Sequence, residues 1–199
     1  MTSSYAGPSK EPDKGNPDSE YEIVSLRRVL STAGEDGART LLEGFSCQRD
    51  QDREDFLHSN AISMEKRDVS RTYLAIRSSD AFLLGYFSIG LKCMLVPPEA
   101  DTISKSFRKR MNVDPNSDVA QAYLLGQLGR DDHSPRGFGA VLLEEALDRL
   151  RTSKGIVGCR LVRLDCADEL IGYYTEKGFR TVVVGSPGDL NHMVILIRG

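Results

Sequence analysis

Two glycines, Gly137 and Gly139, stand where an extended apolar run gives way to an amphipathic helical pattern. Glycines there remove side chains that would keep a ligand away from the backbone, and the first N–H groups of a helix attract an anion. Arg136 adds a positive charge beside them. The segment therefore predicts a pyrophosphate-binding turn, with a plain tight turn as the alternative. Its spacing fits neither the dinucleotide-binding glycine pattern nor the P-loop.

A second motif decides between these alternatives. The first segment reads Ser134-Pro-Arg-Gly-Phe-Gly-Ala140 and continues as Val-Leu-Leu-Glu-Glu-Ala-Leu, and further on the chain reads Tyr173-Tyr-Thr-Glu-Lys-Gly-Phe179. In this order the pair resembles the signature of the GNAT superfamily of N-acetyltransferases, in which Q/R-x-x-G-x-G/A precedes F-Y-x-x-x-G-F. The resemblance covers the chain from about Tyr21 to its end.

The resemblance implies a co-substrate, acetyl-CoA, and residues that would hold it, without a metal ion. A splay between two central strands would expose backbone N–H groups of Leu128, Gly129 and Arg130 to the pantetheine and the thioester. The residues implied for the pyrophosphate are Ser134, Pro135, Arg136, Gly137, Phe138, Gly139 and Ala140. Two positions depart from the family pattern: Ser134 replaces the usual Gln or Arg, and Ala167 replaces an Asn that meets the CoA arm in many members.

Tyr174 is the implied general acid for the CoA thiolate. A phenol with an ordinary pKa of about 10 stays protonated at neutral pH and can still give a proton to a leaving thiolate. The alternative is that Tyr174 only packs on the sheet, as we expect of Tyr173. No base is assigned: Gln127 cannot accept a proton at neutral pH, and the other candidates are a water chain or the side chains of Asp118, Glu99 and His133.

The expected function is transfer of an acetyl group from acetyl-CoA to a primary amine. The order Phe45-Ser-Cys47, an acidic helix, Ser70-Arg-Thr-Tyr73 and Leu84-Gly-Tyr-Phe-Ser88 is similar to a phage and bacterial branch. Some members of that branch are toxins that acetylate aminoacyl-tRNA. The acceptor therefore stays open between a small molecule, a protein amine and aminoacyl-tRNA. A non-catalytic CoA-binding module is a further alternative, supported by the two departures.

A basic cluster, Lys105 to Arg110, could meet the phosphates of tRNA, although a solvated helix face is the simpler interpretation in an acidic protein. The net charge of −3 provides no overall attraction to nucleic acid or to an anionic membrane. No apolar run is long enough to span a membrane, so we expect a cytoplasmic protein, and a homodimer stays open. The four cysteines show no metal-site spacing and read as intracellular thiols.

The elements that must position these residues follow from periodicity. Residues 1–20 hold almost nothing apolar and predict a disordered tail before a GNAT domain at 21–199. The fold class is α/β (α+β), a mixed, mostly antiparallel sheet of about six to seven strands flanked by about four helices. The expected strands are 21–29, 71–77, 82–91, 119–128, 160–166, 179–184 and 191–198. The expected helices are 35–43, 50–67, 137–151 and 168–177, with a short helix in the loop 96–117.

Overall fold

The computed structural model describes residues 20–98, 102–186 and 188–198, so the predicted tail lies outside the described residues except for Glu20. Seven strands form one sheet in the order β1-β2-β3-β4-β5-β7-β6. Neighbouring strands are antiparallel except for β4 and β5, which are parallel. The predicted mixed, mostly antiparallel sheet is confirmed.

The elements of the described chain follow the predicted order. The strands are β1 Tyr21–Ser25, β2 Ser70–Arg77, β3 Leu83–Leu95, β4 Val119–Arg130, β5 Leu161–Cys166, β6 Arg180–Val183 and β7 Asn191–Leu196. The helices are α1 Leu26–Glu43, α2 Gln51–Asp55, η2 Phe56–Asn60, α3 Ala61–Lys66, α4 Lys105–Arg110, α5 Phe138–Val157, η3 Asp168–Leu170 and α6 Ile171–Glu176.

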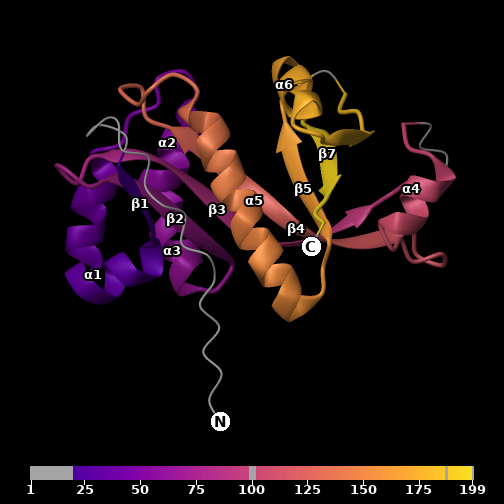
Figure 1. Ribbon diagram of the computed structural model, residues 1–199, viewed down its shortest axis with the longest axis horizontal. Helices are drawn as coiled ribbons and strands as arrows, with labels where there is room; N and C mark the ends of the chain where they lie inside the picture. The colour runs from indigo at the N-terminus through magenta and orange to yellow at the C-terminus, as the bar shows by residue number, and fades with distance from the viewer. Residues whose placement is uncertain (1–19, 99–101, 187, 199) are drawn as a thin grey trace, which may run out of the picture.

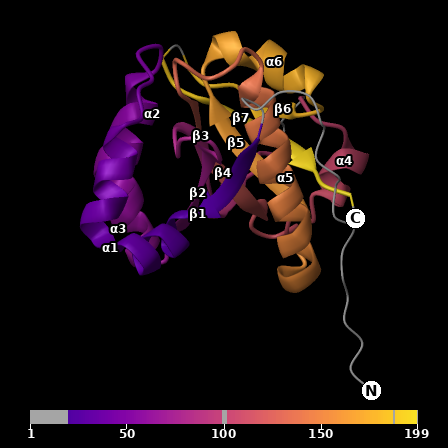
Figure 2. The ribbon, with the colours of Figure 1, turned by 60° about the vertical axis from the view of Figure 1, so that its left-hand side comes forward.

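Helices cover both faces of the sheet (Figures 1 and 2). One face packs against α5 and α6, where Phe87, Leu142 and Tyr174 belong to the largest cluster of buried side chains. The opposite face is covered by α1 to α3 at the β1 end of the sheet and by α4 near β4 and β7. The middle strands β3 and β4 therefore lie between two layers, and the N-terminal end of α5 meets the C-terminal end of β4.

The first predicted strand is wrong at its C-terminal end. Residues 26–29 are helical, because the Ser25 hydroxyl caps the helix by accepting a hydrogen bond from the Arg28 amide at 3.3 Å. Leu26, Val29 and Leu30 follow the spacing of one helix face, with Leu26 and Val29 buried. Gly34 interrupts α1 with a non-helical φ of 72°, so the predicted helix 35–43 is present and an additional helical segment from residue 26 precedes it.

Strand β4 contains a bulge that opens the sheet. Ser88 of β3 pairs with Gln127 and Ile89 pairs with Leu125, so Gly126 is an extra residue in β4. Pairing of β4 with β5 covers only Tyr123–Leu125, whereas pairing with β3 continues to Arg130. The last residues of β4 therefore present an unpaired edge towards β5. This is the splay that the resemblance implies.

Candidate active site

A cavity of about 500 Å³ lies at this open end of β4. Its walls come from strand β4, the start of α5, η3 with α6, and residues 47–53, which lead into α2. We call it the β4 cavity. Its lining residues are Cys47, Arg49, Asp50, Arg53, Leu128, Gly129, Arg130, Gly137, Gly139, Ala140, Glu169, Leu170, Tyr173 and Tyr174.

The glycine turn forms one wall of the β4 cavity. Gly137 precedes α5 with φ of 86°, a left-handed conformation that glycine adopts without strain. The Phe138 and Ala140 amides bond to the carbonyls of Pro135 and Gly137. Among the described residues, the amides of Gly137 and Gly139 have no such acceptor. They are the kind of free N–H group that binds an anion at a helix start.

Four residues of the predicted pyrophosphate segment do not line the β4 cavity. Ser134 and Phe138 are buried: the Ser134 hydroxyl donates to the Leu84 carbonyl, and the Phe138 ring packs edge-on against Tyr21. Pro135 and Arg136 are exposed. The serine side chain thus holds the turn onto β3, which leaves Arg136 as the exposed cation of this segment.

The end of β4 lines the β4 cavity and also holds the glycine turn in place. The Arg130 guanidinium donates to the Ser134 carbonyl at 2.7 Å and thereby holds the turn. Gly129 leaves no room for a side chain, because an added Cβ would lie 2.6 Å from a ring carbon of Tyr86. The backbone of Leu128 to Arg130 is therefore fixed by packing and lies at the surface of the cavity.

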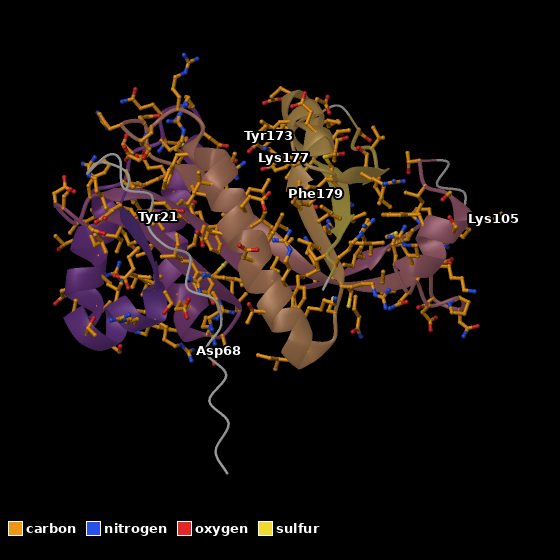
Figure 3. The ribbon with its side chains drawn as sticks, viewed as in Figure 1. Tyr21, Asp68, Lys105, Tyr173, Lys177 and Phe179 are labelled. Atoms are coloured by element: carbon orange, nitrogen blue, oxygen red, sulfur yellow. The ribbon has the colours of Figure 1, made fainter. Side chains whose placement is uncertain are left out.

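Tyr174 lies on α6 and lines the same cavity as the turn. The residue is 8% exposed and packs edge-on against Tyr173 and Phe179, at centroid distances of 5.1 Å and 5.7 Å. Figure 3 shows Tyr173, Lys177 and Phe179 gathered around α6. Burial raises the pKa of Tyr174, and the positive charge of Arg53 opposes that rise. The phenol is thus protonated at neutral pH. Tyr173 also lines the cavity, in addition to the packing predicted for it.

No sequence motif predicts the wall of the cavity that is formed by Cys47, Arg49, Asp50 and Arg53. Two consecutive aspartates after β4 hold this segment in place. The fully buried Asp131 accepts the Ser46 amide at 2.8 Å, and Asp132 accepts the Gln48 amide at 2.8 Å. Such contacts join residues that are far apart in sequence, so no local sequence pattern predicts them.

The structure gives the base candidates different surroundings. Asp118 precedes the opposite end of β4 and pairs with Arg108. The His133 side chain is 79% exposed, pairs with Asp131 and does not line the β4 cavity. Glu99 lies outside the described residues. Gln127 accepts a hydrogen bond from Arg53 at 2.7 Å. The base remains unassigned.

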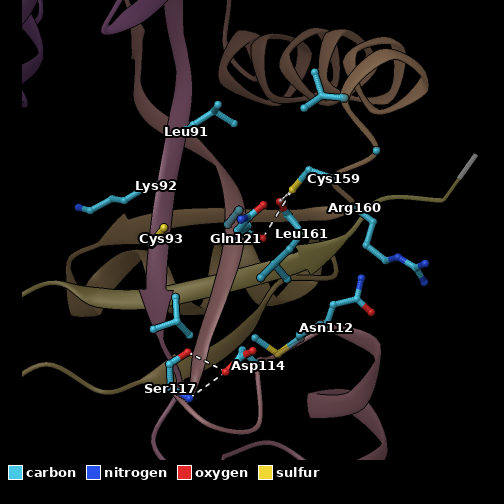
Figure 4. Close-up of a pocket in the computed structure, with 15 residues that line it drawn as sticks. Leu91, Lys92, Cys93, Asn112, Asp114, Ser117, Gln121, Cys159, Arg160 and Leu161 are labelled. Carbon is cyan, nitrogen blue, oxygen red and sulfur yellow. Dashed lines mark hydrogen bonds between the residues drawn. The ribbon is translucent and has the colours of Figure 1, made fainter.

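A second cavity, of about 700 Å³, lies near the C-terminal end of α5 (Figure 4). In it, the Cys159 thiol donates to the Gln121 carbonyl, and Asp114 accepts hydrogen bonds from Ser117. None of the predicted site residues lines this larger cavity. We therefore place the candidate site in the β4 cavity, because the predicted site residues line it although it is the smaller of the two cavities.

Neither a membrane span nor a metal cluster is found in the described part of the chain. None of its helices is both long and apolar enough to cross a bilayer. It also holds no group of three or more His, Cys, Asp or Glu side chains arranged to bind a metal ion.

Comparisons with known proteins agree with this geometry at the level of the fold. No protein-family profile and no curated protein sequence matches the chain. Among solved structures, AtaT complexed with acetyl-methionyl-tRNAfMet superposes with a TM-score of 0.65 at 21% identity, over 86% of this chain and 94% of that one. A mutant of KacT superposes with a TM-score of 0.65 at 19% identity, over 86% of this chain and 93% of that one. AtaTR bound with acetyl-CoA superposes with a TM-score of 0.60 at 19% identity, over 86% of this chain and 91% of that one. The chain therefore has the GNAT fold that its paired motifs predict.

Proposed function

We propose that the protein is an N-acetyltransferase that moves the acetyl group of acetyl-CoA to a primary amine. The β4 cavity carries the proposal, because it joins the splayed end of β4, the glycine turn and Tyr174. Each of these parts alone has a structural explanation. Together they supply backbone donors for a thioester, an anion site for a pyrophosphate and an acid for a leaving thiolate.

Acetyl-CoA fits the donors that the protein leaves unused. The amides of Gly137 and Gly139 would bind the pyrophosphate, with Arg136 as an additional cation. The edge of β4 from Leu128 to Arg130, unpaired towards β5, would hold the pantetheine and polarise the thioester carbonyl. Tyr174 would then protonate the sulfur as the C–S bond breaks.

The acceptor amine is proposed to be the α-amine of aminoacyl-tRNA. An α-amino group has a pKa of about 8, so roughly one in ten is neutral at pH 7, whereas a lysine amine with a pKa of about 10.4 is almost entirely charged. An α-amine therefore suits a site in which no base is identified. AtaT, a structural neighbour, is known in complex with acetyl-methionyl-tRNAfMet. A protein amine or a small amine remains the alternative.

The basic cluster gives this acceptor only partial support. Arg108 is used within the protein, where it donates to the Val96 carbonyl and pairs with Asp118. Lys105, Lys109 and Arg110 are exposed on α4. Lys105 lies at the opposite end of the longest axis from Tyr21 (Figure 3). A contact of α4 with tRNA would thus involve three cations rather than four.

Acetyl-CoA is expected to raise the melting temperature of the protein. A ligand present at 100 times its dissociation constant stabilises the folded state by about 2.7 kcal/mol. The measurement is a thermal unfolding series with acetyl-CoA up to millimolar concentrations, with adenosine as the control ligand. An unchanged melting temperature at millimolar acetyl-CoA would contradict the proposed co-substrate.

A further inference from the structure

Arg53 lines the β4 cavity, as Tyr174 does, and several partners hold it in place. Its Nε lies 3.0 Å from Oδ2 of Asp50, and its Nη1 donates to Oε1 of Gln127 at 2.7 Å. Its backbone carbonyl accepts the hydroxyl of the fully buried Tyr86 at 2.6 Å. The side chain is only 20% exposed. Both the backbone and the guanidinium are thus fixed by Asp50 at the start of α2 and by partners on β3 and β4.

The guanidinium of Arg53 carries a positive charge in a place that is only partly open to solvent. A partly buried cation loses hydration, and Asp50 is its one carboxylate partner among the described residues. Gln127 is a neutral acceptor, so it orients the guanidinium without cancelling its charge. A guanidinium has five N–H donors. The contacts with Asp50 and Gln127 use two of them, so three remain. These unused donors belong to a side chain that lines the cavity.

Tyr174 lines the same cavity, and the positive charge of Arg53 lowers its pKa. Burial works against loss of the phenol proton, since a phenolate is poorly solvated there. Arg53 acts in the opposite direction and lowers the pKa of Tyr174, while Tyr173, Cys166 and Asp50 act less strongly than Arg53 and in the same sense as burial. The other charged groups lining the cavity are Arg49, Arg130 and Glu169. Arg49 pairs with Asp132, and Arg130 binds the turn carbonyls.

We propose that Arg53 is a positioning residue of the transfer reaction, which holds a positive charge in the cavity that Tyr174 also lines, so that this buried phenol can give up its proton to the departing thiolate. The inference rests on the proposed function. The amine nitrogen forms a C–N bond with the acetyl carbon, the C–S bond breaks, and the sulfur takes the Tyr174 proton. The amine releases one proton to water, and the phenolate regains one from water, so the exchange is balanced.

The test is a double-mutant cycle between Arg53 and Tyr174. Arg53→Gln should lower kcat by about 10- to 100-fold, a part of what general acid catalysis contributes, and should leave the KM for acetyl-CoA nearly unchanged. In a Tyr174→Phe background the same change should alter kcat by no more than about threefold, because the two residues act as a unit. Arg53→Lys, which keeps the charge, should recover most of the activity.

Matched variants separate this role from a structural one. Arg67→Gln removes an exposed arginine at the end of α3 and should leave kcat unchanged. If Arg53→Gln does not fold, Gln127→Leu releases the guanidinium instead and should show the same dependence on Tyr174. Equal losses from Arg53→Gln with and without the Tyr174 hydroxyl would overturn the inference, as would no loss at all. Failure of the proposed function would differ, because the unaltered protein would then not bind acetyl-CoA.

Discussion

Tyr174→Phe is expected to lower the rate of acetyl transfer by about 10²- to 10⁴-fold, the range that general acid catalysis supplies. The ring stays in place against Tyr173 and Phe179, so folding and acetyl-CoA affinity should hardly change. Only the proton donor is lost. The measurement is steady-state kinetics with acetyl-CoA varied, in which kcat falls and KM stays roughly constant.

Tyr123→Phe is the matched control for this prediction. Tyr123 is also buried, at 4% exposed, and its hydroxyl on β4 has no hydrogen-bond partner among the described residues. Its loss should leave kcat unchanged. Two outcomes would contradict the acid assignment. Full activity of Tyr174→Phe would mean that water protonates the thiolate or that another step limits the rate, and loss of stability together with affinity would make Tyr174 a packing residue.

Gly137→Val is expected to weaken acetyl-CoA binding by about 100-fold or more. Two effects combine: a β-branched residue is strained at φ of 86°, and its side chain would stand where the anion meets the helix start. Loss of two hydrogen bonds to a charged group costs about 3–6 kcal/mol. The folded variant should therefore show no acetyl-CoA-dependent shift of its melting temperature.

Gly158→Val separates strain from binding, because Gly158 ends the same helix with φ of 82° and lies outside the β4 cavity. Neither glycine has a neighbour within 4 Å of an added Cβ, so strain of about 1–3 kcal/mol is the expected cost at both. Gly158→Val should lose stability and keep the acetyl-CoA shift. Normal acetyl-CoA affinity in folded Gly137→Val would place the co-substrate elsewhere.

The sequence predicts the fold well where a pattern is local and strong. The amphipathic helix after the glycine turn was expected to end at residue 151 but continues to Val157, because Gly158 provides its left-handed cap. The first strand was predicted too long, because weak alternation over 21–29 competed with a serine cap. Its last four residues are helical since Leu26 and Val29 gain burial that way.

The candidate site was predictable only on the side that carries motifs. Tyr174 and the turn glycines belong to the two motifs, the resemblance implies the end of β4, and all of them line one cavity. Asp50 and Arg53 have none, because their place depends on Asp131 and Asp132 holding residues 46–48 from across the fold. Phe138 and Ser134 belong to the motif but face inwards, and spacing alone does not reveal this.

The most direct test of the acetyltransferase proposal is release of free CoA thiol from acetyl-CoA in the presence of acceptors. The panel should contain aminoacyl-tRNA, uncharged tRNA, lysine peptides and small amines. We expect thiol to appear in step with acetylation of the α-amine of aminoacyl-tRNA, and to depend on Tyr174. Acetyl-CoA that binds and raises the melting temperature, yet releases no thiol with any acceptor, would identify the protein as a non-catalytic CoA-binding module.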